Sequence, residues 1–444
     1  MNDGVLRWWA PHALPVSAPA ARDVLVTVES GRITGLEPRV SRERAAELGA
    51  ELHDGCVIAP GFVNAHAHLE YAAYDALVDG LGFAEWIGDH IHRKRRLAPE
   101  QLRASAVLGA HQALHSGITC VGDASFSGDS AHAMHEVGLR GRVYLELFGG
   151  LDDAGAGESL EAALARLDGL PSSDLLEHGL SPHAPYSVGE ALYRRVAASG
   201  LPWMTHLLES RDELAFVRGH GPLLASLERA GVPVPRWDDE APVHALADIL
   251  GPDVVAVHLT QAGPAELEVL AASGAAIAHC PRSNARLGCG RLDLAAVDRA
   301  GITVGLGTDS PASAGPIDPF AELRCALEVH RTAAQDPTWP SLAQLLESAT
   351  LGAARALGYE ELGSLDMGHH ADLVAVHVGP CDDPLAAYVL GAGPSDVRAV
   401  LVAGRDAGVR DRTSLLAARE AAVDARTLLA LPVRRQSPGA RVNV

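Results

Sequence analysis

The stretch Val57-Ile-Ala-Pro-Gly-Phe-Val-Asn-Ala-His66-Ala-His68-Leu-Glu70 is the most informative part of this sequence. Its apolar run, residues 57–66, predicts a buried strand that ends in His66 and His68. Residues i and i+2 of a strand point to the same face, so both imidazoles would converge on one point, as a metal ion requires. A second such pair, His90-Ile-His92, lies in a basic run that ends at Arg96 and indicates a solvated helix face. His-x-His alone is weak evidence for a metal site, so the residues that end the later strands matter more.

About 300 residues after this stretch alternate between strand and helix patterns. Further strands are predicted at 118–124, 142–148, 177–183, 203–208, 254–259, 275–280 and 303–308. Helical patterns lie between them at 99–116, 158–170, 189–199, 264–272, 319–332 and 341–357. This alternation predicts a (β/α)8 TIM barrel. A doubly wound sheet is the weaker alternative, because no glycine-rich phosphate turn comes after the first strand.

Both ends of the chain have short strand patterns separated by glycine turns. They occur at 23–35, 363–376 and 397–404. Such patterns predict a small β domain. We therefore expect residues 1–58 to form the first part of a β-sandwich and residues 59–360 to form the barrel. Residues 361–444 would complete the sandwich and add a C-terminal helical tail.

Ligand-capable side chains close most of the predicted barrel strands. They are His183, His206 followed by Glu209, His258, His279 and Asp309. Catalytic groups of such barrels sit at the C-terminal strand ends. Buried polar groups are costly without partners, so their repeated placement there predicts a site. We expect His279 to be a packing or supporting histidine rather than a ligand.

Composition excludes several classes of function. The net charge of −20 argues against a nucleic-acid partner. We expect a soluble cytoplasmic protein without membrane contact, because no signal peptide and no apolar run of about 18 residues is present. The six cysteines form no CxxC pair, which favours buried thiols over a disulfide framework. The zinc-deaminase signature with P-C-x-x-C is absent. The only lysine, Lys94, excludes a P-loop.

The opening motif, the Gly-Thr-Asp-Ser sequence at 307–310 and the flanking β domain resemble the amidohydrolase superfamily, in its single-metal deaminase branch. Residues 64–70 and 82–87, with the basic run after them, are most similar to the aminodeoxyfutalosine deaminases of menaquinone biosynthesis. Two-metal relatives bridge their ions with a strand lysine, which this chain lacks. The resemblance thus implies one divalent ion per chain, Zn²⁺ first and Fe²⁺ second. The implied ligands are His66, His68, His206 and Asp309.

The resemblance also implies a hydrolytic deaminase. Glu209, three residues past a ligand, would protonate the ring nitrogen, with His258 and Asp309 orienting and deprotonating the attacking water. Glu85 would bind ribose and His183 would face the substrate. Some nucleoside deaminases of the branch carry an arginine after strand three, where this chain has a glycine-rich loop. In the loop after strand seven, Arg282 is expected to bind a substrate carboxylate.

The expected substrate is a small molecule, an aminopurine nucleoside with a carboxylate-bearing 5′ extension, as in 6-amino-6-deoxyfutalosine. Guanine, adenosine or S-adenosylhomocysteine are alternative substrates. A chlorohydrolase or formimino hydrolase of the same superfamily is an alternative activity. A non-enzymatic paralogue is disfavoured, because such proteins lose ligands that this chain keeps. A homodimer is compatible with this architecture.

Overall fold

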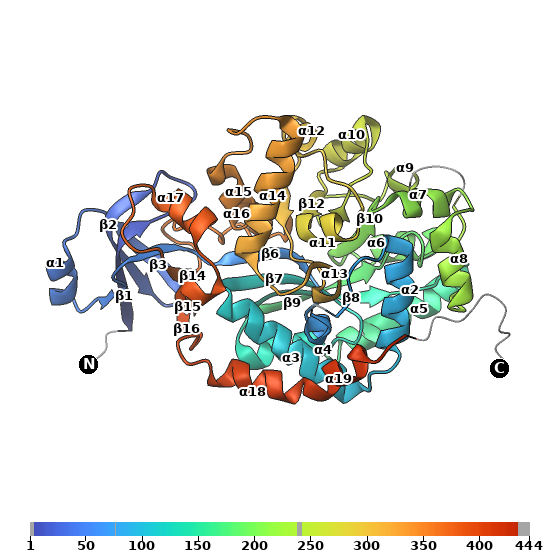
Figure 1. Cartoon of the computed structure of the whole chain (residues 1–444), viewed down its shortest axis with the longest axis horizontal. Coiled ribbons are helices and arrows are strands. Elements are labelled where there is room, and N and C mark those ends of the chain that lie inside the picture. Colours follow the sequence, from blue (N-terminus) through green and yellow to red (C-terminus); the bar gives the residue numbers. More distant parts are fainter. Residues whose placement is uncertain (1–3, 76, 238–241, 434–444) are drawn as a thin grey trace.

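A parallel barrel forms the centre of the part of the chain that the computed structural model describes, residues 4–75, 77–237 and 242–433 (Figure 1). Its eight-stranded sheet runs in chain order from β6 to β13. The strands are β6 (Phe62–Ala67), β7 (Ile118–Ser125), β8 (Arg140–Leu147), β9 (Leu176–Pro182), β10 (Trp203–Leu207), β11 (Val254–His258), β12 (Ala276–His279) and β13 (Val304–Leu306). A parallel bridge between Ala67 and Asp309 brings the two edges together. The predicted (β/α)8 barrel is confirmed.

A second, mixed sheet draws strands from both ends of the chain, and we call it the terminal sheet. Its order is β16-β15-β14-β5-β1-β2-β3, with β4 paired to β1. The strands are β1 (Val5–Ala13), β2 (Ala21–Glu29), β3 (Arg32–Glu37), β4 (Glu51–Leu52), β5 (Cys56–Pro60), β14 (Leu373–His377), β15 (Val397–Val402) and β16 (Arg405–Asp406). The expected small β domain from both termini is thus present, as one connected sheet beside the barrel (Figure 1).

Helices cover the barrel and decorate the terminal sheet. They are α1 (Arg42–Glu47), α2 (Phe83–Lys94), α3 (Pro99–His115), α4 (Asp129–Val137), α5 (Asp153–Leu167), α6 (Glu190–Ala198), α7 (Arg211–Val217), α8 (Pro222–Arg229), α9 (Pro242–Ala245), α10 (Pro264–Ser273), α11 (Pro281–Arg286), α12 (Leu294–Ala300), α13 (Pro311–Ala314), α14 (Pro319–Ala334), α15 (Leu342–Ser348), α16 (Leu351–Ala356), α17 (Pro384–Ala386), α18 (Thr413–Ala421) and α19 (Val423–Ala430). A 3-10 helix, η1 (Leu69–Tyr74), comes directly after β6. None of the described helices combines the length and apolar character that a bilayer crossing needs.

The apolar run 57–66 forms two strands, which corrects the prediction of one. It breaks at Gly61, so that β5 pairs in the terminal sheet and β6 in the barrel. A Cβ on Gly61 would lie 2.2 Å from Thr119 Cγ2, a distance that no side chain tolerates. Glycine therefore lets the chain pass from one sheet to the other against β7. This crossing delivers His66 and His68 to the barrel's C-terminal end.

Asn64, inside the opening motif, ties the first barrel strand to the last. Its side-chain nitrogen donates to Thr308 Oγ1 at 2.7 Å, and its Oδ1 accepts from the Thr308 N–H at 2.9 Å. The Asp309 N–H donates to the His66 carbonyl at 3.0 Å. These bonds replace strand pairing where the barrel closes and hold Asp309 beside His66.

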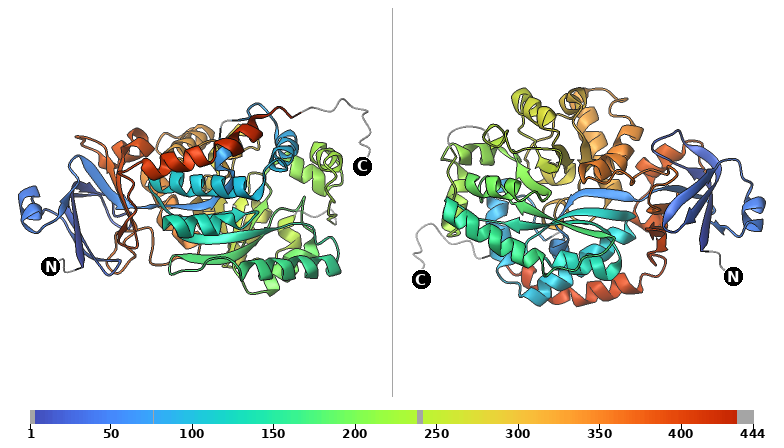
Figure 2. Two further views of the ribbon diagram at one scale, coloured as in Figure 1. Left: turned by 90° about the horizontal axis from the view of Figure 1, so that it is seen from below. Right: turned by 180° about the vertical axis from the view of Figure 1, so that it is seen from behind.

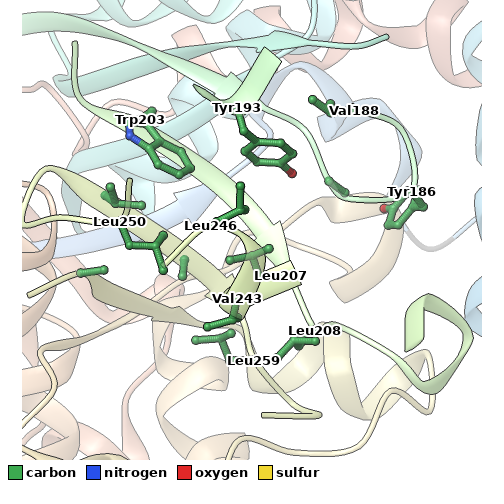
Figure 3. Close-up of a cluster of buried hydrophobic side chains, with 14 of the residues drawn as sticks. Tyr186, Val188, Tyr193, Trp203, Leu207, Leu208, Val243, Leu246, Leu250 and Leu259 are labelled. Carbon is green, nitrogen blue, oxygen red and sulfur yellow. The ribbon is translucent and has the colours of Figure 1, made fainter. Parts of the chain in front are cut away.

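A large apolar cluster packs against the outside of β9, β10 and β11 (Figure 3). It contains the buried Trp203 and Tyr193, whose hydroxyl contacts Thr205 Oγ1 at 2.9 Å. Tyr186 and Leu208 bring this cluster to the end of the barrel at which the polar strand ends gather. Each fully buried large side chain contributes roughly 1.5–3 kcal/mol relative to exposure, so this side of the barrel is firmly supported.

The helices α18 and α19 return along the barrel, where α18 packs against α3 and α19 contacts the basic end of α2 (Figure 2). Arg93 donates to the Leu429 carbonyl, and Arg96 donates to the Leu431 carbonyl at 2.6 Å. The solvated face expected from the sequence is therefore present only in part, since His92 and Arg95 are exposed while Arg93, Lys94 and Arg96 are half-buried. The helical tail is observed as far as α19, and residues 434–444 of the predicted tail lie outside the described residues.

Candidate active site

Side chains from the ends of four strands, β6, β10, β11 and β13, meet in one buried cluster. His66 Nε2 lies 3.4 Å from Asp309 Oδ1, and His68 Nε2 lies 3.4 Å from His206 Nε2. Three overlapping groups have donor atoms within 4.8 Å of one another: His66, His206 and His258; His66, His68 and Asp309; and Glu209, His258 and Asp309. The structure thus brings together the residues that the sequence predicted as ligands and proton-transfer groups.

Hydrogen bonds behind the cluster fix which imidazole nitrogen faces inward. His68 Nδ1 lies 2.8 Å from the Ala124 carbonyl, and His206 Nδ1 lies 2.7 Å from the His183 carbonyl. A carbonyl only accepts, so both Nδ1 atoms carry the proton and both Nε2 atoms offer lone pairs. This arrangement is typical of metal-ligating histidines.

The donor set fits a divalent ion on two further grounds. His66 Nε2 is buried and has no hydrogen-bond partner among the described residues. Burial lowers the pKa of His68, and neighbouring His66 lowers it further, so the ring is neutral and free to coordinate. Three imidazoles and one carboxylate suit Zn²⁺ and Fe²⁺.

Glu209 and His258 form a pair beside this cluster. Glu209 Oε1 lies 3.5 Å from His258 Nε2, and both side chains are buried. Asn284 Nδ2 lies 3.0 Å from His258 Nδ1, so its amide donates and leaves the ring proton on Nε2. Burial, followed by the carboxylates of Asp309 and Glu213, raises the pKa of Glu209 well above its usual range. A protonated Glu209 can act as an acid.

Glu213, which the sequence analysis did not single out, positions Glu209. Its Oε2 accepts from the Glu209 N–H at 2.8 Å and its Oε1 accepts from the Leu208 N–H at 2.9 Å. Leu208 has φ = 49°, and His258 and Asp309 have φ = 76° and 54°. Such backbone strain in non-glycine residues clusters at functional sites and persists only where neighbours enforce it. No pattern in the sequence distinguishes Glu213 from an ordinary carboxylate of a helix's first turn.

A cavity of about 420 Å³ opens onto the cluster. His68, His206, Glu209, His258 and Asp309 form its polar floor. His183 lines it as predicted, with Nδ1 2.7 Å from Ser187 Oγ and its ring 4.9 Å from that of Phe148. The rest of the wall is largely aromatic and aliphatic: Tyr71, Trp86, Ile87, Ile91, Phe126, Phe148, Leu227, Val232 and Pro233.

Two predicted substrate contacts lie elsewhere. Glu85 is exposed on the first turn of α2 and is not among the residues that line this cavity. Arg282 donates to the Ala314 and Pro316 carbonyls, each at 2.9 Å, and lies 3.5 Å from Glu322 Oε1. Its guanidinium supports the loop after β13 and does not face the cavity. The loop after β12, the seventh barrel strand, is next to the site in sequence, but its Arg282 bonds the loop carbonyls and not the cavity.

Three residues of the cavity were missed or misjudged. His90 lies within the aromatic wall, 4.8 Å from the Tyr71 ring and 5.3 Å from Trp86, rather than on a solvated face. Lys94, on the same side of α2, also lines the cavity. So does Glu146 near the end of β8. A polar residue near a strand end could have drawn attention to Glu146, but the orientation of α2 has no local sequence cue.

Comparison with known proteins matches residues 57–406 to the amidohydrolase family. This chain belongs to the amidohydrolase family. It is 30% identical over 399 residues to a 5′-deoxyadenosine deaminase of Methanopyrus kandleri, covering 85% of this chain and 87% of that one. It is 30% identical over 395 residues to a 5-methylthioadenosine/S-adenosylhomocysteine deaminase of Thermococcus kodakarensis, covering 86% and 88%.

Two solved deaminase structures share this fold. An adenosine deaminase of Xanthomonas campestris with bound zinc superposes with a TM-score of 0.77 at 27% identity, covering 95% of this chain and 98% of that one. Helicobacter pylori aminofutalosine deaminase, in complex with methylthio-coformycin, has a TM-score of 0.77 at 23% identity, covering 90% and 99%. The latter likeness establishes the fold alone.

Proposed function

We propose that this amidohydrolase is a hydrolytic deaminase of adenine nucleosides modified at the 5′ position, with 6-amino-6-deoxyfutalosine as its first substrate. One observation carries the proposal: Glu209 and His258 face each other at 3.5 Å beside the His/Asp cluster, on the floor of a cavity of about 420 Å³. A water nucleophile and a proton donor are what replacement of an aromatic amine by oxygen needs. The curated relatives named for 5′-modified adenosines support this substrate class.

We assign His66, His68, His206 and Asp309 as the residues that would hold one divalent ion, with zinc as first choice and iron(II) as second. Such an ion supplies a water of lowered pKa as nucleophile near neutral pH. Asp309 would accept the proton of that water. Its Oδ2 accepts a hydrogen bond from the Ser313 hydroxyl at 2.9 Å, and its Oδ1 faces the cluster. His258 would orient the water through its Nε2 proton.

Glu209 would complete the reaction by moving protons on the substrate side. Attack at the amine-bearing carbon places negative charge on the adjacent ring nitrogen, to which protonated Glu209 donates. The leaving amine would then take up the proton that Asp309 accepted from the water and depart as ammonia, while the remaining proton of the attacking oxygen would return to Glu209. His183, in the cavity wall, would contact the base or sugar, and the aromatic wall would exclude water from the reacting ring.

The substrate class is tested by a side-by-side measurement of kcat/KM on metal-replete protein. The panel is aminodeoxyfutalosine, 5′-deoxyadenosine, S-adenosylhomocysteine, adenosine and guanine, with ammonia release as the readout. We expect kcat/KM for the 5′-modified adenine nucleosides to exceed that for guanine by at least about 100-fold. A site whose polar groups match one substrate discriminates at least this strongly against a substrate that leaves them unpaired. Preferential release of ammonia from guanine, or from none of the panel, would contradict the proposal.

A further inference from the structure

Lys94, the only lysine in the sequence, is half-buried at the cavity wall beside three aromatic rings. It is the last residue of α2, and its Nζ lies 3.6 Å from the ring centroid of Phe126. The centroids of Phe148 and Tyr71 are 5.5 Å and 6.0 Å from the same nitrogen. Contacts of this kind stabilise an ammonium group only modestly compared with full hydration.

Lys94 forms no direct ion pair with a described residue, although Glu146 and Glu70 lie near enough to favour its charged form. Within the ranges that the structure describes, Lys94 Nζ has no hydrogen bond and no carboxylate within 4.0 Å. The carboxylate of Glu70, which is buried nearby, accepts hydrogen bonds from the hydroxyls of Ser125 and Ser127. Burial lowers the pKa of Lys94, while Glu146 and Glu70 act in the opposite direction. An ammonium in such a place is better stabilised by an anion that enters the cavity.

The other cations near the cavity are engaged elsewhere. Arg93 bonds Asp89 at 2.6 Å and also the Leu429 carbonyl, and Arg96 bonds the Leu431 carbonyl. Arg95, which also touches the cavity, is exposed and bonds the Ala230 carbonyl at 3.3 Å. Arg282 is held by the carbonyls described above. Lys94 is therefore the cation best placed to meet a ligand's negative charge.

A second observation, on Glu146, favours a ligand at this wall. Glu146 is 5% exposed and lines the same cavity, yet its Oε1 has no hydrogen-bond partner among the described residues. A buried carboxyl oxygen left without a donor is costly, so substrate hydroxyl or amino groups would satisfy it. Lys94 and Glu146 thus present an unsatisfied donor and an unsatisfied acceptor to one space.

The rings between Lys94 and the His/Asp cluster indicate the ligand's shape. Tyr71 lies against His68 with centroids 5.7 Å apart, and Phe148 lies 4.9 Å from His183. Phe126 and Phe148 are 5.9 Å apart in an edge contact. This wall runs from the cluster to the ammonium and favours a flat, apolar group that ends in an anion. An aromatic carboxylate has both features.

We propose that Lys94 is the specificity-determining residue that binds the carboxylate of an aromatic acid attached at the 5′ end of the adenine nucleoside. This inference rests on the proposed function and replaces the role expected of Arg282. The base would lie over the His/Asp cluster, and the aryl group would lie along Phe126 and Phe148. Neutral 5′ groups would fit the same wall without using the ammonium.

Lys94→Met and Lys94→Arg test the proposal on the metal-replete enzyme, with Arg95→Met as a control that removes the same charge from the neighbouring residue. Lys94→Met should lower kcat/KM for the 5′-arylcarboxylate nucleoside by about 10- to 100-fold, mainly through KM. It should change kcat/KM for 5′-deoxyadenosine less than about threefold. Lys94→Arg should restore much of the loss, and Arg95→Met should affect both substrates little. Equal losses on both substrates, or none, would overturn the proposal, as would an equal loss in Arg95→Met.

Calorimetric titration separates this inference from the proposed function. The 6-oxo product with its free carboxylate and the methyl ester of that product are titrated into wild type and the three variants. Wild type should prefer the carboxylate by about 10-fold or more, and Lys94→Met should abolish this preference whether or not the enzyme turns over. Failure of the deaminase assignment would appear only as missing ammonia. An equal Kd for acid and ester in wild type would exclude Lys94 as a carboxylate site.

Discussion

Glu209 combines deep burial, a neighbouring imidazole and a backbone fixed by another carboxylate. It is not needed to complete the His66, His68, His206 and Asp309 set, so its loss separates metal binding from proton transfer. Glu209→Gln keeps the size of the side chain but removes its titrating proton. We expect one equivalent of metal by elemental analysis and a fall in kcat of about 100-fold or more.

The exposed carboxylate of α5, Glu158, provides a matched control for this variant. Glu158→Gln should leave both metal content and kcat unchanged, because the side chain is at the surface, away from the cavity. Near-normal turnover in Glu209→Gln would show that another group protonates the ring. Loss of the metal would show instead that Glu209 belongs to the ligand set.

The connection between β4 and β5 buries a histidine whose ionisation links pH to stability. His53 is 5% exposed and packs against Trp8 with ring centroids 4.5 Å apart. Burial lowers the pKa of His53 from 6.5 to about 4, although Asp406 and Asp54 oppose the shift. Glu51 Oε1 is 3.7 Å from His53 Nε2 and is paired with Arg410.

The folded protein therefore binds the His53 proton more weakly than the unfolded chain does. Its contribution to stability is complete above pH 6.5 and is lost as pH falls towards 4, by at most about 3 kcal/mol. His53→Asn should flatten this part of the profile of unfolding free energy against pH, measured by urea denaturation at pH 7.5 and 4.5. Parallel profiles for variant and wild type would contradict this source of acid sensitivity.

For the whole molecule, one buried ion pair joins the barrel to the terminal sheet. Arg140, at the start of β8, bonds both oxygens of Asp372 at 2.9 and 3.0 Å, and both side chains are buried. Asp372 Oδ1 also accepts from the Ala403 N–H at 2.8 Å. Asp372→Ala leaves the guanidinium buried without its partner and should cost about 3–5 kcal/mol of stability.

Calorimetric unfolding measures this cost, with Arg32→Ala as the comparison. The Arg32–Glu361 pair also spans the chain, but both side chains are largely exposed. Its loss should shift the unfolding temperature far less, because water screens exposed pairs. Similar shifts in the two variants would mean that the Arg140–Asp372 pair contributes no more than a surface pair.

The barrel and the His/Asp cluster could be predicted because each depends on local pattern. Apolar runs define the strands, and the residue after each run falls at the same end of a parallel barrel. The break at Gly61 escaped prediction although Pro60-Gly61 is a turn signal, because the residues on both sides are strand-like and fully buried. Only the close approach of Thr119 reveals that the chain changes sheets there.

The substrate-facing residues could not be predicted in the same way. Lys94 and His90 face the cavity, while the carbonyls of Leu429 and Leu431 hold Arg93 and Arg96. That contact spans more than 300 residues of sequence, so the basic run alone favours a surface. Arg282 faces inward because loop carbonyls and Glu322 take its donors. Only tertiary packing distinguishes these arginines from Lys94.

In the proposed reaction, an amine on a purine ring is exchanged for oxygen from water. Turnover of a 5′-modified adenine nucleoside by metal-replete enzyme in ¹⁸O-labelled water tests it, with mass spectrometry of the product and quantification of ammonia. We predict one ¹⁸O in the 6-oxo product and one ammonia per product molecule. A product that keeps its amino nitrogen, or that gains no ¹⁸O from water, would contradict the account.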